Sequence, residues 1–131
     1  MNRQKIVFLT GAGISAESGL STFRDKDGLW TNEEWARLAR INALYNETQK
    51  CLDFYNFRRK QLAEVEPNDA HRMIVELEKE YEVIVITQNV DNLHERAGST
   101  NVIHVHGELS KVCSLRDRTT CVKEYPLEIP I

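Results

Sequence analysis

Ile6-Val-Phe-Leu-Thr10 runs directly into Gly11-Ala-Gly-Ile-Ser-Ala16, and this junction decides the fold. The apolar run has the length of a strand, and it ends where glycine permits a tight turn and a close approach of the backbone to a ligand. Gly11, Gly13 and Ala16 satisfy the pattern GxGxx(G/A), which predicts a nucleotide diphosphate bound at the N-terminus of the helix that follows. A plain strand-to-helix turn without a ligand is the alternative.

Composition limits the class of protein. The chain has 131 residues, 41% of them hydrophobic, so it can form one compact domain. Its net charge of −3 disfavours nucleic acid as a partner. No apolar run approaches the roughly 20 residues of a membrane helix, and the N-terminus lacks the regions of a signal peptide. The odd set Cys51, Cys113 and Cys121 does not resemble a disulfide framework. We therefore expect a cytoplasmic protein with reduced thiols and no membrane partner.

The rest of the chain predicts alternating helices and strands. Helices are expected from Asn32 to Ile41, with Thr31 and Glu34 as a capping box, and around 52–62, 70–77 and 93–96; strands are expected over 6–10, 82–87 and 101–105. Asn68 is the expected cap of the third helix, and Gly98 is the expected end of the fourth. Segment 82–87 is apolar on both faces, as a parallel strand buried between helices is. The order predicts an α/β fold, the N-terminal part of a Rossmann-like parallel sheet flanked by helices.

Polar residues follow each predicted strand at its carboxyl end. Ligands of open α/β sheets bind at that edge, so the expected site combines Gly11–Gly13, Gln88–Asp91 and His106–Gly107. Asn89 and Asp91 can hydrogen-bond amide and hydroxyl groups of a ligand, and a histidine at a strand end can act as a base. The alternative is that Asn89 and Asp91 cap the next helix and that the histidines are structural.

Three motifs follow one another along the chain. They are Gly11-Ala-Gly-Ile-Ser-Ala-Glu-Ser-Gly19 with Thr22-Phe-Arg24, then Thr87-Gln-Asn-Val-Asp-Asn-Leu-His94, then His106-Gly-Glu-Leu109. Together they resemble the sirtuin family of NAD-dependent protein deacylases, over residues 6–112. The resemblance implies removal of acetyl, succinyl or malonyl groups from the lysines of acylated proteins. NAD is consumed in that reaction, which gives nicotinamide and O-acyl-ADP-ribose.

The resemblance also implies roles for individual residues. His106 matches the family's general base, and Asn89 is the second implied catalytic residue. Phe23 would shield C1′ of the nicotinamide ribose from water. The implied NAD contacts are Gly11, Ala12, Gly13, Ser15, Phe23, Arg24, Trp30, Gln88, Asn89 and Asp91. Hydride transfer is disfavoured, because the acidic residue expected about twenty positions after the glycines, at the end of a second strand, is missing.

Tyr55 and Arg58 suggest which acyl group is bound. Their i, i+3 spacing puts a phenol and a guanidinium on one helix face, where both can hold a carboxylate. In the context Phe54-Tyr-Asn-Phe-Arg-Arg59 the pair resembles the Tyr-x-x-Arg signature of bacterial desuccinylase and demalonylase sirtuins. The alternative is a solvated surface arginine. Segment 31–50 matches that subgroup poorly, so the resemblance does not predict which residues form the wall of the acyl channel.

Two features depart from the family. Many sirtuins carry two Cys-x-x-Cys pairs after the His-Gly-Glu motif; this chain has neither pair, and Cys113 and Cys121 alone predict no metal site. Residues 1–131 are expected to form a partial catalytic domain, truncated at Ile131, with an incomplete sheet. The apolar faces expected to be exposed are those of Val7, Leu9, Val83, Val85 and Ile103, which favours self-association through the sheet edge.

Three alternatives to an active deacylase stay open. The chain can be a half-site that binds NAD or ADP-ribose without chemistry. It can be an inert fragment, which would show no cooperative unfolding. It can also hydrolyse NAD without a protein substrate, if water reaches C1′ of the ribose.

Overall fold

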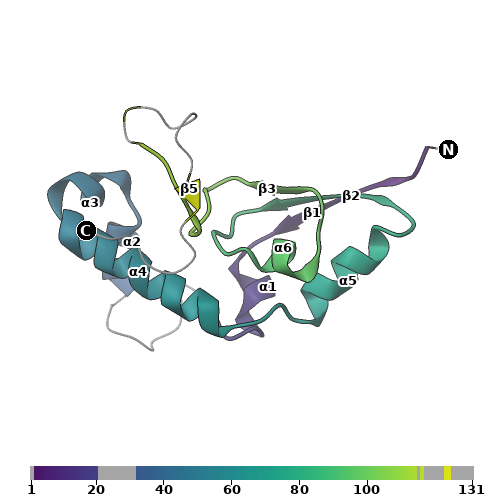
Figure 1. Ribbon diagram of the computed structural model, residues 1–131, viewed down its shortest axis with the longest axis horizontal. Helices are drawn as coiled ribbons and strands as arrows, with labels where there is room; N and C mark the ends of the chain where they lie inside the picture. Colours follow the sequence, from purple (N-terminus) through teal and green to yellow (C-terminus); the bar gives the residue numbers. More distant parts are fainter. Residues whose placement is uncertain (1, 21–31, 115, 117–122, 125–131) are drawn as a thin grey trace.

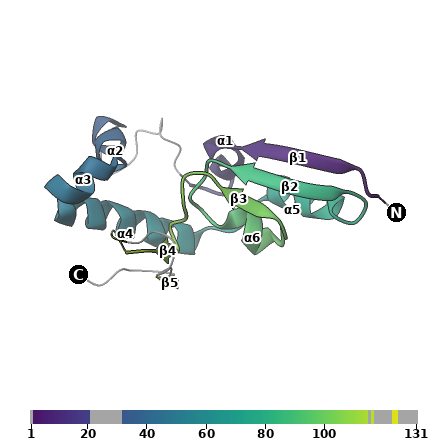
Figure 2. The ribbon, with the colours of Figure 1, turned by 90° about the horizontal axis from the view of Figure 1, so that it is seen from above.

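The computed structural model describes residues 2–20, 32–114, 116 and 123–124. The elements are β1 (Lys5–Thr10), α1 (Ala12–Ala16), α2 (Asn32–Leu38), α3 (Ile41–Asn46), α4 (Thr48–Glu64), α5 (Asp69–Leu77), β2 (Glu82–Thr87), α6 (Leu93–Ala97), β3 (Val102–His104), β4 (Lys111–Val112) and β5 (Lys123–Glu124). The sheet with α1, α5 and α6 forms one end of the molecule, and α2, α3 and α4 form the other (Figure 1, Figure 2).

A parallel sheet in the order β1-β2-β3 confirms the predicted α/β fold. β4 and β5 form a separate antiparallel pair. The register aligns Thr10 with Thr87 and Thr87 with His104, so the carboxyl ends of the three strands lie together. The turns that follow the strands therefore meet at one edge of the sheet.

Helices cover one face of the sheet and leave apolar residues exposed on the other. Helices α1, α5 and α6 lie on one side (Figure 1), where Val83 and Val85 pack against Ile74 of α5. The prediction that Val83 and Val85 would be exposed is wrong: they are 5% and 0% exposed, because alternate residues of a strand point to opposite faces. The prediction is confirmed on the other face, where Leu9 is 72% exposed and Val7 and Ile103 are also exposed. Because Ile84 and Ile86 on β2 are only half-buried, the expectation of a strand buried on both faces is wrong.

The helix expected from Asn32 to Ile41 is divided into α2 and α3. Arg40 is extended (φ −86°, ψ 145°) and precedes α3, and Ile41 is 51% exposed instead of belonging to the apolar stripe. The turn lets both helices pack on α4 in one core of Trp35, Leu38, Ala43 and Phe54. The rings of Trp35 and Phe54 meet edge to face, with centroids 5.1 Å apart. Thr31, the expected cap, lies outside the described residues.

Two predicted helix boundaries are confirmed. Asn68 Oδ1 accepts the backbone N–H of Ala70, and Asn68 Nδ2 donates to the Ile14 carbonyl and to Ser18 Oγ, so one residue caps α5 and ties it to α1. Gly98 ends α6 with φ 116°, a conformation that favours glycine. No helix in the described ranges is both long and apolar enough to cross a membrane.

Candidate functional site

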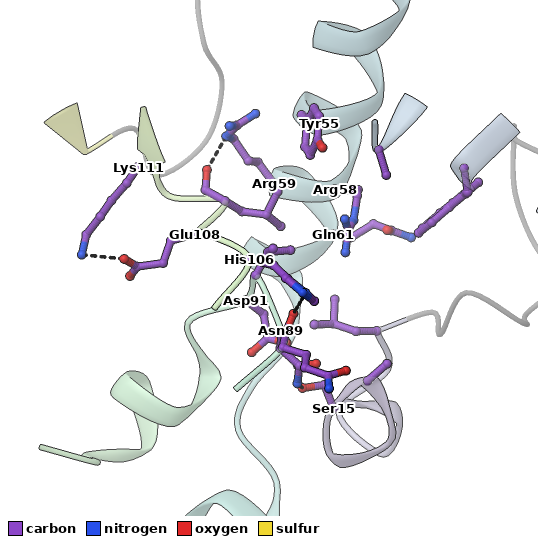
Figure 3. A pocket seen from close by; sticks show the side chains of 17 residues that line it. Ser15, Tyr55, Arg58, Arg59, Gln61, Asn89, Asp91, His106, Glu108 and Lys111 are labelled. Atoms are coloured by element: carbon purple, nitrogen blue, oxygen red, sulfur yellow. Dashed lines mark hydrogen bonds and ion pairs between the residues drawn. The ribbon is translucent and has the colours of Figure 1, made fainter. Parts of the chain in front are cut away.

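A pocket of about 400 Å³ lies where the turns after β1 and β2 and the segment after β3 face α4 (Figure 3). Its lining residues are Ala12, Ser15, Leu20, Trp35, Ala39, Tyr55, Arg58, Arg59, Gln61, Gln88, Asn89, Val90, Asp91, His106, Glu108, Leu109 and Lys111. Both predicted catalytic residues and both predicted acyl-group residues are among them. Gly11 and Gly13 flank Ala12 but do not line the pocket. Phe23, Arg24 and Trp30 lie outside the described residues.

Asn89 connects the turn after β2 to the glycine turn after β1. Its side chain is buried, and Nδ2 donates to the Gly11 carbonyl (3.0 Å) and to Ser15 Oγ (3.3 Å). Its backbone N–H donates to Thr87 Oγ1. The Asn89 side chain therefore joins the two turns and does not cap α6, so the capping alternative is wrong for this residue.

Asp91 both holds the start of a helix and lines the pocket. Oδ1 accepts the backbone N–H of Leu93, the first residue of α6, and Oδ2 accepts the hydroxyl proton of Ser15 at 2.9 Å. Asp91 is 6% exposed and Ser15 is 2% exposed. The capping alternative holds for one carboxylate oxygen, while the other fixes Ser15 on the pocket wall.

His106 has an orientation suited to proton transfer. Its Nδ1 lies 3.2 Å from the Gln88 carbonyl oxygen. A carbonyl only accepts hydrogen bonds, so Nδ1 carries the proton and Nε2 of the neutral ring is left as an acceptor. Gly107 follows with φ 82° and turns the chain immediately after His106. The arrangement can take a proton from a hydroxyl group of a bound ligand.

Arg58 lies on the pocket wall and packs on aromatic rings. Its guanidinium carbon is 5.3 Å from the centroid of Trp35 and 5.7 Å from that of Phe54. Burial lowers the pKa of Arg58, while the charges of Tyr55 and Asp91 act to raise it. Burial also raises the pKa of Tyr55, against the nearby arginines. Arg58 is thus half-buried beside Tyr55 and is not a freely solvated arginine.

Arg59 and Glu108 line the pocket but were not predicted. Arg59 is 5% exposed, and its Nε donates to the Leu109 carbonyl at 2.6 Å, which ties the segment after His106 to α4. Burial lowers the pKa of Arg59, opposed by Tyr55. The sequence could have predicted the burial of Arg59 from its i, i+3 spacing to the apolar Leu62, because this spacing puts both residues on the buried side of α4. Glu108 stands within the His-Gly-Glu motif, so its signal was its position beside His106.

The comparisons with known proteins agree on one family. Residues 11–128 match the model of the Sir2 family. The NAD-dependent protein deacylases of Bacteroides thetaiotaomicron and of Helicobacter pylori strain 26695 are each 56% identical over 114 residues, covering 87% of this chain and 49% and 50% of the relatives. A Sir2 homologue solved as an NAD complex superposes with a TM-score of 0.84 at 43% identity, covering 98% of this chain and 50% of that one. The chain spans about half the length of the relatives it matches. The family match over 11–128 shows that the chain belongs to the Sir2 family, the sirtuins.

Proposed function

We propose that this pocket is the NAD-binding side of a sirtuin deacylase centre, which removes acyl groups from protein lysines and gives nicotinamide and O-acyl-ADP-ribose. The observation that carries the proposal is the orientation of His106. Its Nδ1–H is engaged by the Gln88 carbonyl, so the base nitrogen Nε2 is available in a pocket lined by Asn89 and Asp91. A general base needs this combination of a fixed tautomer and access to the ligand.

The proposed NAD contacts follow the turns at the sheet edge. Gln88, Asn89 and Asp91 face the nicotinamide ribose, and the diphosphate lies along the glycine turn. A Cβ atom added to Gly13 would meet no atom of the described residues within 4 Å, which leaves room for a ligand beside that turn. The residues proposed for the rest of the cofactor are Gly11, Ala12, Gly13, Ser15, Phe23, Arg24 and Trp30.

The proposed reaction has two stages. The carbonyl oxygen of the acyl-lysine attacks C1′ of the ribose, and nicotinamide leaves with the electrons of the broken C–N bond. His106 Nε2 then takes the proton of a ribose hydroxyl, whose oxygen attacks the acyl carbon. The lysine nitrogen takes up that proton and leaves as the free amine. Water adds to the acyl carbon and breaks its bond to the oxygen on C1′, so the acyl group stays on the ribose hydroxyl. Asn89 contributes by fixing the wall that faces the ribose, through its bonds to Gly11 and Ser15.

The test is nicotinamide release from NAD, with and without a succinyl-lysine peptide. Peptide-dependent release in the steady state, beyond the first turnover, that is lost by about 100-fold or more in His106→Ala supports the proposal, because His106 acts only after nicotinamide has left. Isothermal titration with NAD runs in parallel, because the variant should keep most of its NAD affinity. Full deacylation by His106→Ala would remove that residue from the mechanism. Release without peptide would instead indicate NAD hydrolysis.

A second candidate is a binding module that holds NAD or ADP-ribose without chemistry. It is favoured by one observation, that the bonds of the buried Asn89 side chain to Gly11 and Ser15 shape the pocket at the glycine turn, an arrangement that binding needs and that involves no proton transfer. Micromolar NAD binding with no nicotinamide release, with or without peptide, would select this candidate. Cooperative unfolding of the sample distinguishes it from an inert fragment.

The proposed acyl preference is for groups that end in a carboxylate. Tyr55 and Arg58 share the pocket wall, and a guanidinium on a partly desolvated wall favours an anion. Arg58→Met should reduce removal of succinyl groups about tenfold more than removal of acetyl groups. Lys60→Met, an equal change of charge at an exposed position on α4, is the matched control. Equal losses on both substrates would defeat the preference.

Partners and location complete the proposal. The partners are acylated proteins and a second copy of this chain, which would pair through the exposed sheet face at Val7, Leu9 and Ile103. Sedimentation should show Leu9→Lys to be more monomeric than the parent chain; an unchanged profile would rule out this face. A cytoplasmic location is proposed because Cys51 and Cys113 are free thiols, which a reducing compartment favours.

A further inference from the structure

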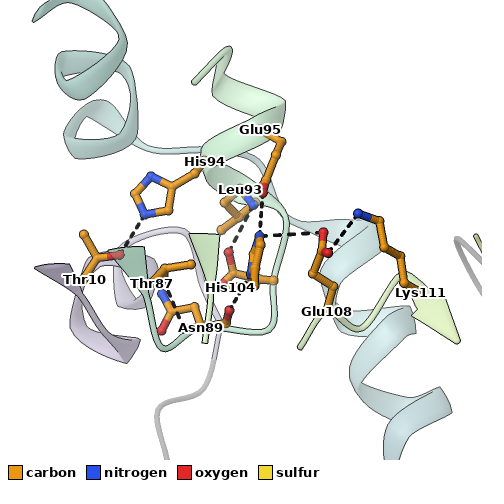
Figure 4. A network of polar contacts seen from close by, with 10 residues as sticks. Thr10, Thr87, Asn89, Leu93, His94, Glu95, His104, Glu108 and Lys111 are labelled. Carbon is orange, nitrogen blue, oxygen red and sulfur yellow. Dashed lines mark hydrogen bonds and ion pairs between the residues drawn. The ribbon is translucent and has the colours of Figure 1, made fainter. Parts of the chain in front are cut away.

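His104 is a buried histidine two residues before His106 whose two ring nitrogens are both engaged (Figure 4). Its side chain is 6% exposed. Nδ1 lies 2.9 Å from the Asn89 carbonyl oxygen, the carbonyl next to the one that His106 contacts. Nε2 lies 2.5 Å from Glu95 Oε1 and 3.7 Å from Glu108 Oε1. The ring therefore touches the turn after β2, helix α6 and the segment after His106.

These contacts determine the charge of His104. A backbone carbonyl and a carboxylate both only accept hydrogen bonds, so both ring nitrogens must donate. A histidine that donates from both nitrogens is an imidazolium cation. A metal ion shared by Nε2 and Glu95 would hold two ligand atoms about 3.3 Å apart in a tetrahedral site, so a separation of 2.5 Å is that of a direct hydrogen bond.

The charged groups around His104 come from each element packed against it. Helix α6 presents Glu95 and His94, the segment after β3 presents Glu108, and Lys111 donates to Glu108 from the far side at 2.8 Å. Burial alone lowers the pKa of His104. The hydrogen bonds to Glu95 and to the Asn89 carbonyl, with the charges of the two glutamates, outweigh burial and raise that pKa overall. Burial raises the pKa of Glu95, but its bond to His104 brings it below its ordinary value.

We propose that His104 is a positioning residue of the site, a cation that holds the Asn89 backbone, helix α6 and the segment after His106 in one arrangement. This inference rests on the proposed function for its effect on catalysis, but its geometry can be tested without activity. Asn89 is the link, because the residue whose carbonyl His104 holds also donates to Gly11 and Ser15. Loss of the proton frees one of the two acceptors, so the arrangement weakens as pH rises.

The first experiment follows side-chain and backbone nitrogen signals by NMR across pH 5 to 10. His104 should remain doubly protonated above the ordinary histidine range of about 6.5. The signals of Asn89 and His106 should change as His104 loses its proton. In Glu95→Gln the His104 transition should move to lower pH. Glu76→Gln, the same change at an exposed glutamate on α5, should leave it in place. An ordinary His104 titration, or Asn89 and His106 signals that ignore it, would overturn the proposal.

The second experiment measures deacylation against pH for His104→Gln, which keeps one donor and cannot titrate. It should lower kcat about tenfold at pH 7, with a peptide KM within about twofold, and remove the alkaline decline of the parent chain. His71→Gln alters a buried histidine away from Asn89 and should lower thermal stability while keeping that decline. An alkaline decline that persists unchanged in His104→Gln contradicts the proposal. A parent chain without peptide-dependent release would defeat the proposed function alone, since the NMR result decides His104.

Discussion

His104 and His106 each reach a backbone carbonyl at the carboxyl end of the sheet, whereas the buried rings of His71 on α5 and His94 on α6 pack edge to face on each other. The ring centroids of His71 and His94 are 4.9 Å apart. His71 Nε2 and His94 Nδ1 have no hydrogen-bond partner among the described atoms. The four histidines of the chain thus form two pairs with different surroundings.

The difference teaches that burial does not by itself determine the charge of a histidine. Burial lowers the pKa of His71, with a further decrease from Arg72 opposed by Asp91. Burial also lowers the pKa of His94, helped by His71 and His104 and opposed by carboxylates. His104 is buried too, yet its pKa is raised, because Glu95 and the Asn89 carbonyl accept from its ring. Well-placed acceptors reverse the effect of desolvation.

The largest expected effect is the loss of folding stability that His71 and His94 cause at acidic pH. Histidines whose folded pKa is lowered stabilise the fold above the unfolded value of about 6.5 and cease to do so as pH falls through the folded pKa. The free energy of unfolding should therefore drop below pH 6.5, by up to about 1.4 kcal/mol per pH unit for each histidine. Urea titrations at pH 7, 6 and 5 measure the slope.

His94→Gln tests how much of the pH dependence of stability comes from the His71–His94 pair. It removes one titrating group while glutamine can still bond Thr10 Oγ1, which His94 Nε2 contacts at 2.9 Å. Its stability should depend less steeply on pH than that of the parent chain. Gln49→Ala changes a side chain that does not titrate, at an exposed position on α4, and as the control it should keep the parent slope. Equal slopes of unfolding free energy against pH for all three proteins would show that His94 does not contribute to the acid sensitivity of the fold.

His104 should show a smaller effect of opposite sign. Its raised folded pKa means that its stabilisation is fully present below about pH 6.5 and is lost as pH rises through the folded pKa. His104→Gln should therefore destabilise the fold at pH 6 by about 1.5 kcal/mol, as expected for a hydrogen bond to a charged group, and by less at pH 9. Thermal unfolding at the two pH values checks this. A loss that grows with pH would show that His104 is neutral in the fold.

The strands and turns were predictable because they depend on local sequence. The strand over 82–87, the cap at Asn68 and the glycine end at Gly98 follow from periodicity and backbone preference. The division between α2 and α3 was missed because it depends on Phe54, a residue of α4 around which Trp35 and Ala43 must both pack. A uniform apolar pattern also cannot tell which face of the sheet the helices cover.

The site was predictable as a set of residues but not as a network of charges. Strand ends and motifs brought Ser15, Asn89, Asp91 and His106 to one pocket. The state of His104 depends on Glu95 and on a backbone carbonyl of Asn89, which lie 9 and 15 positions away along the chain. Neither contact has a periodic signal, because one partner is on a helix and the other is an atom that every residue carries. The motifs therefore identified His106 as a site residue but did not identify His104, two positions earlier.

The smallest expected effect is at Lys111, and it tests whether Glu108 belongs to the environment of His104. The Lys111–Glu108 pair is partly exposed, so Lys111→Met should cost less than about 1 kcal/mol of stability. The same change removes the Lys111 ammonium from the Glu108 carboxylate, which lies 3.7 Å from His104 Nε2. The more negative surroundings favour the imidazolium form, so the His104 transition should move to higher pH. Lys79→Met removes an exposed cation paired with Glu76 on α5 and should leave the transition unmoved. If both variants leave it unmoved, Glu95 and the Asn89 carbonyl set the charge of His104 without Glu108, and the difference between the two histidine pairs rests on the two acceptors that His104 contacts directly.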